Sequence, residues 1–301
     1  MREMHAVRRG FTAAAIMSVA VAAFAAQDAV KPLDVTPGLS TPESALYDAA
    51  ADLYLVSNIN GNPSAKDGNG FISRVAPDGS VKDLKWIDGA RPEVTLHAPK
   101  GMAFRGDTLL VADIDAIRLF DRTTGKPAGA WDVPGSTFLN GVAVGRDNTV
   151  YATDTGVDLA TGELKSTGTA AVYRFDAKGT PTVVARGKEL GGPNGILAGP
   201  DGLTVVDFMS KRILRVSFDG KVTTHATLPQ GGLDGVERLP DGSLLVSSWE
   251  ANAIFRVSPA GQASVLVPDV TSPADLGIDT KRNLVLIPLF TKDTLRVVPI
   301  R

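Results

Sequence analysis

One pattern recurs six times along the chain and constrains its fold more than any other feature. Each copy contains two short runs in which apolar and polar residues alternate, followed by an arginine set among apolar residues, as in ILRV at Arg215 and IFRV at Arg256. Turn sequences such as PDG and FDG bound the runs. Alternation with a period of two between such turns predicts β-strands joined by tight turns. The six arginines are Arg74, Arg118, Arg174, Arg215, Arg256 and Arg296.

The spacing of the copies predicts the architecture. A four-stranded unit that repeats roughly every 40 residues is the sequence signature of a β-propeller blade. We therefore predict an all-β fold, a six-bladed β-propeller formed by a single domain over residues 26–301. The sixth copy offers only three strands, so we expect residues 29–38, AVKPLDVTPG, to supply its outer strand. That strand would close the ring and remove an exposed sheet edge.

The N-terminal residues have the composition of an export signal. Residues 1–10 are basic, whereas residues 11–26, FTAAAIMSVAVAAFAA, are apolar but short for a membrane span. Ala23 and Ala25 supply the small residues that signal peptidase recognises. We predict a signal peptide over residues 1–25 and an exported protein, periplasmic or secreted, with no membrane span after cleavage. The alternative is an apolar helix packed on the domain, and RRGF at Arg8 leaves secretory or twin-arginine export open.

The overall composition excludes some classes of function. The chain has 31 Lys and Arg against 33 Asp and Glu, and it has no basic runs, so nucleic acid is not an expected partner. It contains no cysteine, which excludes thiol catalysis and zinc–thiolate sites.

One position varies within the repeated frame. It is the residue that follows the Pro or Leu at the start of each innermost strand, and it faces the central channel at one mouth of a propeller. We call these six residues the channel positions: Glu43, Lys100, Asn140, Asn194, Asp234 and Ala274. Four of them, the oxygen quartet, carry carboxylate or amide oxygens: Glu43, Asn140, Asn194 and Asp234. Hard oxygen donors suit Ca²⁺ or Mg²⁺ better than Zn²⁺ or Cu²⁺, although channel residues bonded only to water and strand ends remain the alternative.

The quartet in these blades resembles that of the senescence-marker-protein (SMP-30)/gluconolactonase family, which includes regucalcin-like proteins. Paraoxonase and diisopropyl-fluorophosphatase are more distant. The resemblance rests on TPESALYD, LNGVAVGRD, PNGILAGPDG and LDGVERLPDG, and extends over about residues 30–301. It implies one divalent cation of the Ca²⁺ type, with Mg²⁺, Mn²⁺ or Zn²⁺ as alternatives, held by the oxygen quartet. It also implies a metal-dependent hydrolase, a lactonase or esterase that opens a small lactone or ester by metal-activated water with Asp234 as base. The expected partner is then a small-molecule substrate, and we expect a monomer.

Lys100 departs from the pattern, because paraoxonases carry a histidine at this channel position. Three readings of a buried lysine stay open. It grips an acidic substrate or polarises a carbonyl, it acts as a base with a lowered pKa, or it replaces the metal by pairing with Glu43 and Asp234. An outward-facing lysine is the fourth.

Further candidates for substrate contact lie near the same mouth. The number of residues between the channel residue and the blade arginine is larger in blades one and three than in the others. This difference places insertions at residues 58–70 and 155–168. We call these Gly-rich segments the lid connections, and we expect them to cover the site; tolerated surface insertions are the alternative. The predicted substrate-binding residues are Lys100, His97, Asp154, Asp207 and Trp249, and the predicted catalytic residues are Asp234 and Lys100.

The main alternative function is a non-catalytic propeller that binds a ligand or a protein, with Lys100 in place of the metal. This alternative is supported by Lys100 itself and by the scarcity of aromatic residues and histidines in the segments predicted to form the rim. A strictosidine-synthase-like condensing enzyme is a third hypothesis, for which no distinguishing motif is present.

Overall fold

A computed structural model describes Met1 and residues 31–301. The signal-peptide and export predictions rest on residues 2–30 and so lie outside the described residues. In the described part of the chain, no helix has both the length and the apolar character needed to cross a membrane.

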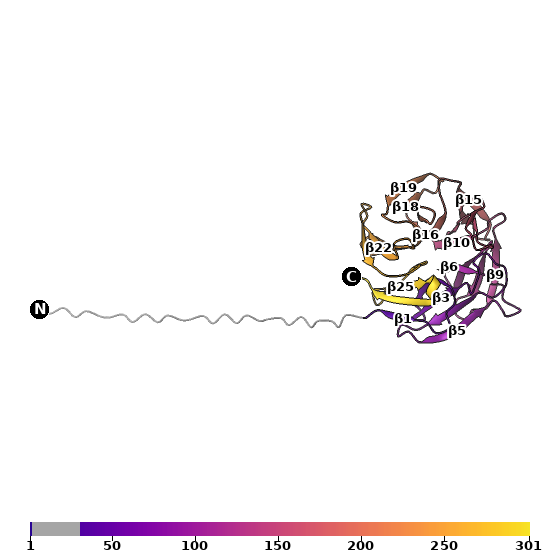
Figure 1. Ribbon diagram of the computed structural model, residues 1–301, viewed down its shortest axis with the longest axis horizontal. Helices are drawn as coiled ribbons and strands as arrows, with labels where there is room; N and C mark the ends of the chain where they lie inside the picture. The colour runs from indigo at the N-terminus through magenta and orange to yellow at the C-terminus, as the bar shows by residue number, and fades with distance from the viewer. Residues whose placement is uncertain (2–30) are drawn as a thin grey trace. The chain divides into compact units, whose positions relative to one another are not determined.

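Six four-stranded antiparallel sheets form the blades of a propeller and surround a central axis (Figure 1). The fold prediction is therefore confirmed. The innermost strands are β2 (Pro42–Asp48), β6 (Pro99–Arg105), β10 (Leu139–Val144), β16 (Pro193–Gly199), β20 (Leu233–Arg238) and β24 (Gly277–Asp279). The second strands are β3 (Leu53–Asn58), β7 (Thr108–Asp113), β11 (Val150–Asp154), β17 (Gly202–Asp207), β21 (Leu244–Ser248) and β25 (Leu284–Leu289).

The repeated arginines lie on the third strands, as the alternating pattern predicts. These strands are β4 (Phe71–Val75), β8 (Ala116–Asp121), β14 (Ala171–Phe175), β18 (Arg212–Val216), β22 (Ala253–Val257) and β26 (Thr294–Pro299). The outer strands are β5 (Val81–Asp88), β9 (Pro127–Asp132), β15 (Pro181–Arg186), β19 (Val222–Thr227), β23 (Ala263–Val267) and β1 (Leu33–Val35). A short hairpin, β12 (Val157–Asp158) and β13 (Lys165–Ser166), and a 3-10 turn, η1 (Phe290–Lys292), complete the described elements.

The ring closes through strand β1, as the sequence predicts. β1 pairs antiparallel with β26, with Leu33 opposite Val297 and Val35 opposite Leu295, so the sixth blade combines both ends of the domain. In Figure 1 the indigo start of the domain accordingly lies beside its yellow end. This pairing covers the edge that β26 would otherwise expose.

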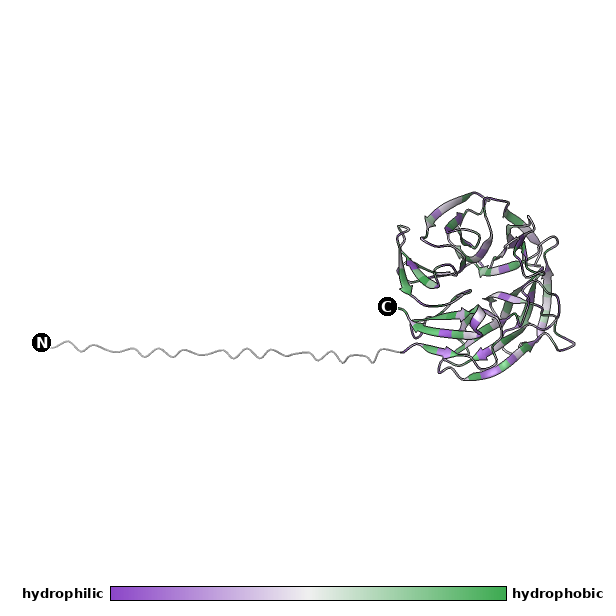
Figure 2. Cartoon of the chain, viewed as in Figure 1, coloured by the Kyte–Doolittle hydropathy of each residue, from purple (hydrophilic) through white to green (hydrophobic). Residues whose placement is uncertain are grey.

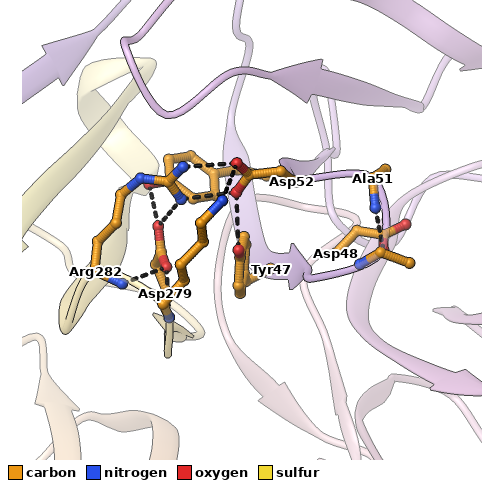
Figure 3. A network of polar contacts seen from close by, with 9 residues as sticks. Tyr47, Asp48, Ala51, Asp52, Asp279 and Arg282 are labelled. Carbon is orange, nitrogen blue, oxygen red and sulfur yellow. Dashed lines mark hydrogen bonds and ion pairs between the residues drawn. The ribbon is translucent and has the colours of Figure 1, made fainter.

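A polar network joins the first and last blades where strand β2 turns into β3 and strand β24 turns into β25 (Figure 3). The Arg282 guanidinium donates to Asp52 at 2.7 Å and to Asp279 at 2.9 Å, and the Tyr47 hydroxyl donates to Asp52 at 2.8 Å. The hydrogen bonds from Arg282, Lys281 and Tyr47 hold the pKa of Asp52 well below its usual range. These hydrogen bonds and ion pairs hold the first blade against the sixth, in addition to the pairing of β1 with β26.

The hydrophobic core consists of layers between blades. Each of six apolar clusters joins two neighbouring blades; one, for example, packs Leu110 and Ile117 of blade two against Leu139 and Tyr173 of blade three. Figure 2 shows apolar segments on strands around the whole ring. Since the sheets pack face to face, the axis itself needs no apolar core, and polar side chains can line it.

Below the channel positions the axis holds a cavity of about 270 Å³, into which two further acids, Glu237 and Asp275, project. Burial, and then repulsion from Asp275, raises the pKa of Glu237 to about 8. A glutamate in an unfolded chain titrates near pH 4.3. Between these values the folded state binds more protons, so its stability falls as pH rises and the loss is complete above the folded pKa.

Replacing Glu237 with glutamine removes that loss. We expect the melting temperature of Glu237→Gln to exceed that of the wild type by roughly 10 °C at pH 9 and to match it near pH 4.5. Thermal unfolding of both proteins across this range measures the effect. Glu189→Gln, at an exposed site, is the control and should show no pH-dependent difference. An equal offset at both pH values would contradict the raised pKa.

Candidate functional site

Irregular backbone at the channel positions directs their side chains to the axis. In each of the first five blades the pairing of the innermost strand shifts register around the channel residue. In blades two to five a glycine follows the channel residue and permits close packing of the next blade: a Cβ on Gly141 would lie 2.7 Å from the Asn194 carbonyl oxygen, and one on Gly195 would lie 2.5 Å from that of Asp234. Neighbouring channel residues therefore lie at the same level along the axis.

Two hydroxyl groups fix this arrangement. The Thr153 Oγ1 accepts from the Gly141 backbone N–H at 2.9 Å and donates to the Asn194 carbonyl at 2.6 Å. Ser247 repeats the motif between Gly235, at 2.7 Å, and the carbonyl of Ala274, at 2.9 Å. Each hydroxyl thus joins one channel position to the next blade. Sequence reasoning missed both residues, although each lies one place before the end of its second strand.

The oxygen quartet presents four buried oxygens that have no hydrogen-bond partner. They are Glu43 Oε2, Asn140 Oδ1, Asn194 Oδ1 and Asp234 Oδ1, on side chains that are only 3–4% exposed. Among the described residues just one other buried side-chain oxygen is unpartnered, Oδ1 of Asn69. Buried polar atoms are normally paired, so four unpaired oxygens on blades one, three, four and five are available to ligate a cation.

The remaining polar atoms of two quartet members are already bonded, which orients the free ones. The Asn140 Nδ2 donates to Thr155 Oγ1 at 3.2 Å, so its Oδ1 is the free atom. The Trp249 indole N–H donates to Asp234 Oδ2 at 2.8 Å and leaves Oδ1 free.

The electrostatics of the quartet favour a cation. Burial, and then repulsion from Asp234 and Asp275, raises the pKa of Glu43 well above its usual range; burial and Asp275 do the same for Asp234. A positive charge among these groups would relieve the strain of burying like charges. In residues 31–301 no group of three or more His, Asp or Glu side chains is arranged for a metal. The quartet instead combines two carboxylates with two amides, a donor set that fits Ca²⁺.

Lys100 is fully buried beside the quartet, so an outward-facing lysine is wrong. Its ammonium donates to the carbonyl oxygens of Ala98 at 3.0 Å and Pro63 at 3.1 Å, and it lies 4.2 Å from the ring centroid of Phe138. Burial lowers the pKa of Lys100 to about 8, although the charge of Glu43 opposes the shift. No ion pair within residues 31–301 joins Lys100 to a quartet carboxylate, so the pairing that would replace a metal is not formed in this structure.

A cavity of about 70 Å³ lies over the quartet. Its floor includes Glu43, Asn140 and Asp234, and Lys100 lines it as well. Its other lining residues are Ile59, Pro63, Phe138, Thr155, Val157, Leu159, Leu164, Phe208, Trp249 and Phe290. The interpretation of the rim as poor in aromatic residues is wrong, because four aromatic side chains meet there from different connections.

The two lid connections meet above this cavity. The Ser64 Oγ accepts from the Leu159 N–H at 2.9 Å, and the Asn62 side chain donates to the Leu159 carbonyl at 3.2 Å. Pro63 belongs to one connection, and Val157, Leu159 and Leu164 to the other. The insertions therefore form part of the cavity wall.

Of the predicted substrate-binding residues, Lys100 and Trp249 line the cavity and three others do not. The His97 Nδ1 accepts from the Gly68 N–H at 3.0 Å and so holds a lid connection. Asp154 accepts from the N–H groups of Phe138 and Gly156 at 3.0 and 2.9 Å. Asp207 accepts from Gly192 N–H at 2.9 Å and pairs with Arg212 at 2.7 Å. Both carboxylates anchor the chain where it enters or leaves a blade.

Comparison with known proteins agrees with this architecture. The model of the family described as "SMP-30/Gluconolactonase/LRE-like region" matches residues 42–285. No curated protein matches the chain. Among solved structures, a gluconolactonase from Xanthomonas campestris superposes with a TM-score of 0.69 at 18% identity, covering 91% of each chain.

Two lyase structures share the same fold. A catalytically inactive virginiamycin B lyase from Staphylococcus aureus, bound to quinupristin, has a TM-score of 0.59 at 16% identity over 89% of this chain and 98% of its own. A streptogramin B lyase has a TM-score of 0.61 at 13% identity over 89% and 96%. At such identities the likeness shows the fold alone.

Proposed function

The chain belongs to the SMP-30/gluconolactonase/LRE-like family, and on that premise we propose that it is a divalent-cation-dependent lactonase that opens a small lactone or related ester. The gluconolactonase fold of a structural neighbour supports a lactonase type of propeller. Propeller folds also serve many unrelated functions, so the proposal depends on the site rather than on the fold.

The observation that carries the proposal is the oxygen quartet. Its four free oxygens are buried on blades one, three, four and five, and three of the residues that carry them, Glu43, Asn140 and Asp234, line the cavity. Glu43, Asn140, Asn194 and Asp234 would hold a Ca²⁺-type ion, with two carboxylates matching its charge. When bound, such an ion supplies Lewis-acid polarisation of a lactone carbonyl.

The residues around the quartet provide the other requirements of ester hydrolysis. Trp249 holds one oxygen of Asp234, so the carboxylate keeps a fixed orientation as the base that accepts a proton from the attacking water. Lys100, held by two carbonyl oxygens, has one N–H left to donate to a substrate oxygen. The lid connections and the aromatic side chains surround the site with apolar groups, and a site with less water strengthens these interactions.

Hydrolysis of an unsubstituted lactone tests the proposal. We expect the purified protein to hydrolyse δ-valerolactone in the presence of Ca²⁺, and we expect EDTA to reduce the rate about a hundred-fold or more, with recovery when Ca²⁺ is restored. Acid release followed at constant pH measures the rate. Asn194→Ala should lose the Ca²⁺-dependent activity, whereas Asn148→Gly, at an exposed turn, should retain it. Absence of hydrolysis, or a rate that EDTA leaves unchanged, would contradict the proposal.

A further inference from the structure

We propose that the substrate is a lactone that carries an alkyl or aryl substituent, not a polyhydroxylated sugar lactone. This inference rests on the proposed lactonase function and concerns what the cavity above the quartet accepts. The observation behind it is the chemistry of the cavity walls.

The walls are almost entirely apolar and come from several blades. Ile59 and Pro63 line the cavity from one lid connection, and Val157, Leu159 and Leu164 from the other. Aromatic side chains complete the wall. Trp249 contacts Phe208 edge to face, with ring centroids 5.6 Å apart, and Phe290 with centroids 5.2 Å apart. A substituent between these rings and the lid would bury apolar surface, which favours binding.

The few polar groups in the walls already have partners. Thr155 Oγ1 donates to the Pro193 carbonyl at 2.9 Å and accepts from Asn140. The Trp249 N–H is bonded to Asp234, and the Lys100 ammonium donates to Ala98 and Pro63. Among the described side chains that line the cavity, this leaves the free oxygens of Glu43, Asn140 and Asp234 and the third N–H of Lys100, which lie together where the reacting ester group would bind.

A sugar lactone therefore meets an unfavourable environment. Its ring carries several hydroxyl groups, and each would lose hydrogen bonds to water without gaining one from the walls. An alkyl or aryl group at the same ring position has no such requirement. The same walls thus favour one class of lactone and disfavour the other.

Three δ-lactones with the same six-membered ring separate the possibilities: δ-valerolactone, δ-nonalactone and glucono-δ-lactone. After subtraction of spontaneous hydrolysis, we expect kcat/KM for δ-nonalactone to exceed that for δ-valerolactone by about ten-fold or more, and that for glucono-δ-lactone by about a hundred-fold. A kcat/KM for glucono-δ-lactone equal to or above that for δ-nonalactone would overturn the inference while the lactonase function stands. If none of the three is hydrolysed, the proposed function fails and the inference fails with it.

A pair of substitutions tests the wall directly. Leu164 is 40% exposed on a lid connection, so Leu164→Ser is not expected to impair folding. It should lower kcat/KM for δ-nonalactone several-fold more than for δ-valerolactone. Val265→Ser, on outer strand β23 with Val265 53% exposed, is the matched control and should leave the ratio unchanged. An unchanged ratio in Leu164→Ser would contradict contact between that wall and the substituent.

Discussion

Replacing Asp234 with asparagine is expected to lower kcat for lactone hydrolysis by about a thousand-fold. The substitution keeps the size of the side chain and the acceptor for the Trp249 indole N–H, but it removes the carboxylate that takes the proton from water. It also removes one of two charges that would hold the cation. Steady-state rates on a lactone that the wild type hydrolyses measure the loss.

Two comparisons show what the loss means. Asp201→Asn changes an exposed turn aspartate in the same type of frame and should retain wild-type rates. Trp249→Phe keeps the carboxylate but removes its hydrogen bond of 2.8 Å, so we expect a smaller fall, about ten-fold. If Asp234→Asn hydrolyses lactones as fast as the wild type, Asp234 is not the base.

Removal of divalent cations is expected to lower the melting temperature by about 10 °C. A ligand present at about 1,000 times its Kd and bound only to the folded state adds roughly 4 kcal/mol to the free energy of unfolding. In a domain of this size each kcal/mol shifts the melting temperature by roughly 2–4 °C. In addition, the cation would relieve the burial of Glu43 and Asp234 as like charges. Thermal unfolding in Ca²⁺ and in EDTA measures the shift.

The control for this experiment is a protein whose quartet is broken. Asn194→Ala should melt at one temperature in Ca²⁺ and in EDTA, because one of the four ligands is gone. Equal melting temperatures for the wild type in both solutions would instead contradict a cation at the quartet, and with it the metal-dependent lactonase.

The repeat made the fold and the register of the quartet accessible from sequence. A Pro or Leu, a variable residue and usually a glycine recur at the start of the first five innermost strands, as in Pro193, Asn194 and Gly195; in the sixth blade Pro273 and Ala274 precede β24. In the structure, the glycine is required because the next blade approaches within van der Waals contact. Backbone constraints that recur from blade to blade produce a repeating pattern in the sequence. That pattern indicates which residues lie at the same level along the axis.

The walls of the cavity were not accessible in the same way. Phe138, Phe208 and Phe290 lie in connections of different blades, and only the closed ring brings them together. The position of Asp154 and Asp207 at the ends of second strands, near the rim, predicts substrate contacts. The structure instead uses both carboxylates to accept backbone N–H groups, a role that has no distinct signature in sequence.

The apolar layers between blades have a consequence for how such a protein changes over evolutionary time. Because those layers carry the stability, the six channel positions are released from any common packing requirement, and this chain fills them with Glu, Lys, Asn, Asn, Asp and Ala. The residues at these positions can therefore vary while the blades that carry them stay the same. New chemistry can arise by substitution of residues at the mouth of the channel. The hydrogen bonds of the Thr153 and Ser247 hydroxyl groups to the next blade keep the backbone of these positions aligned during such substitutions.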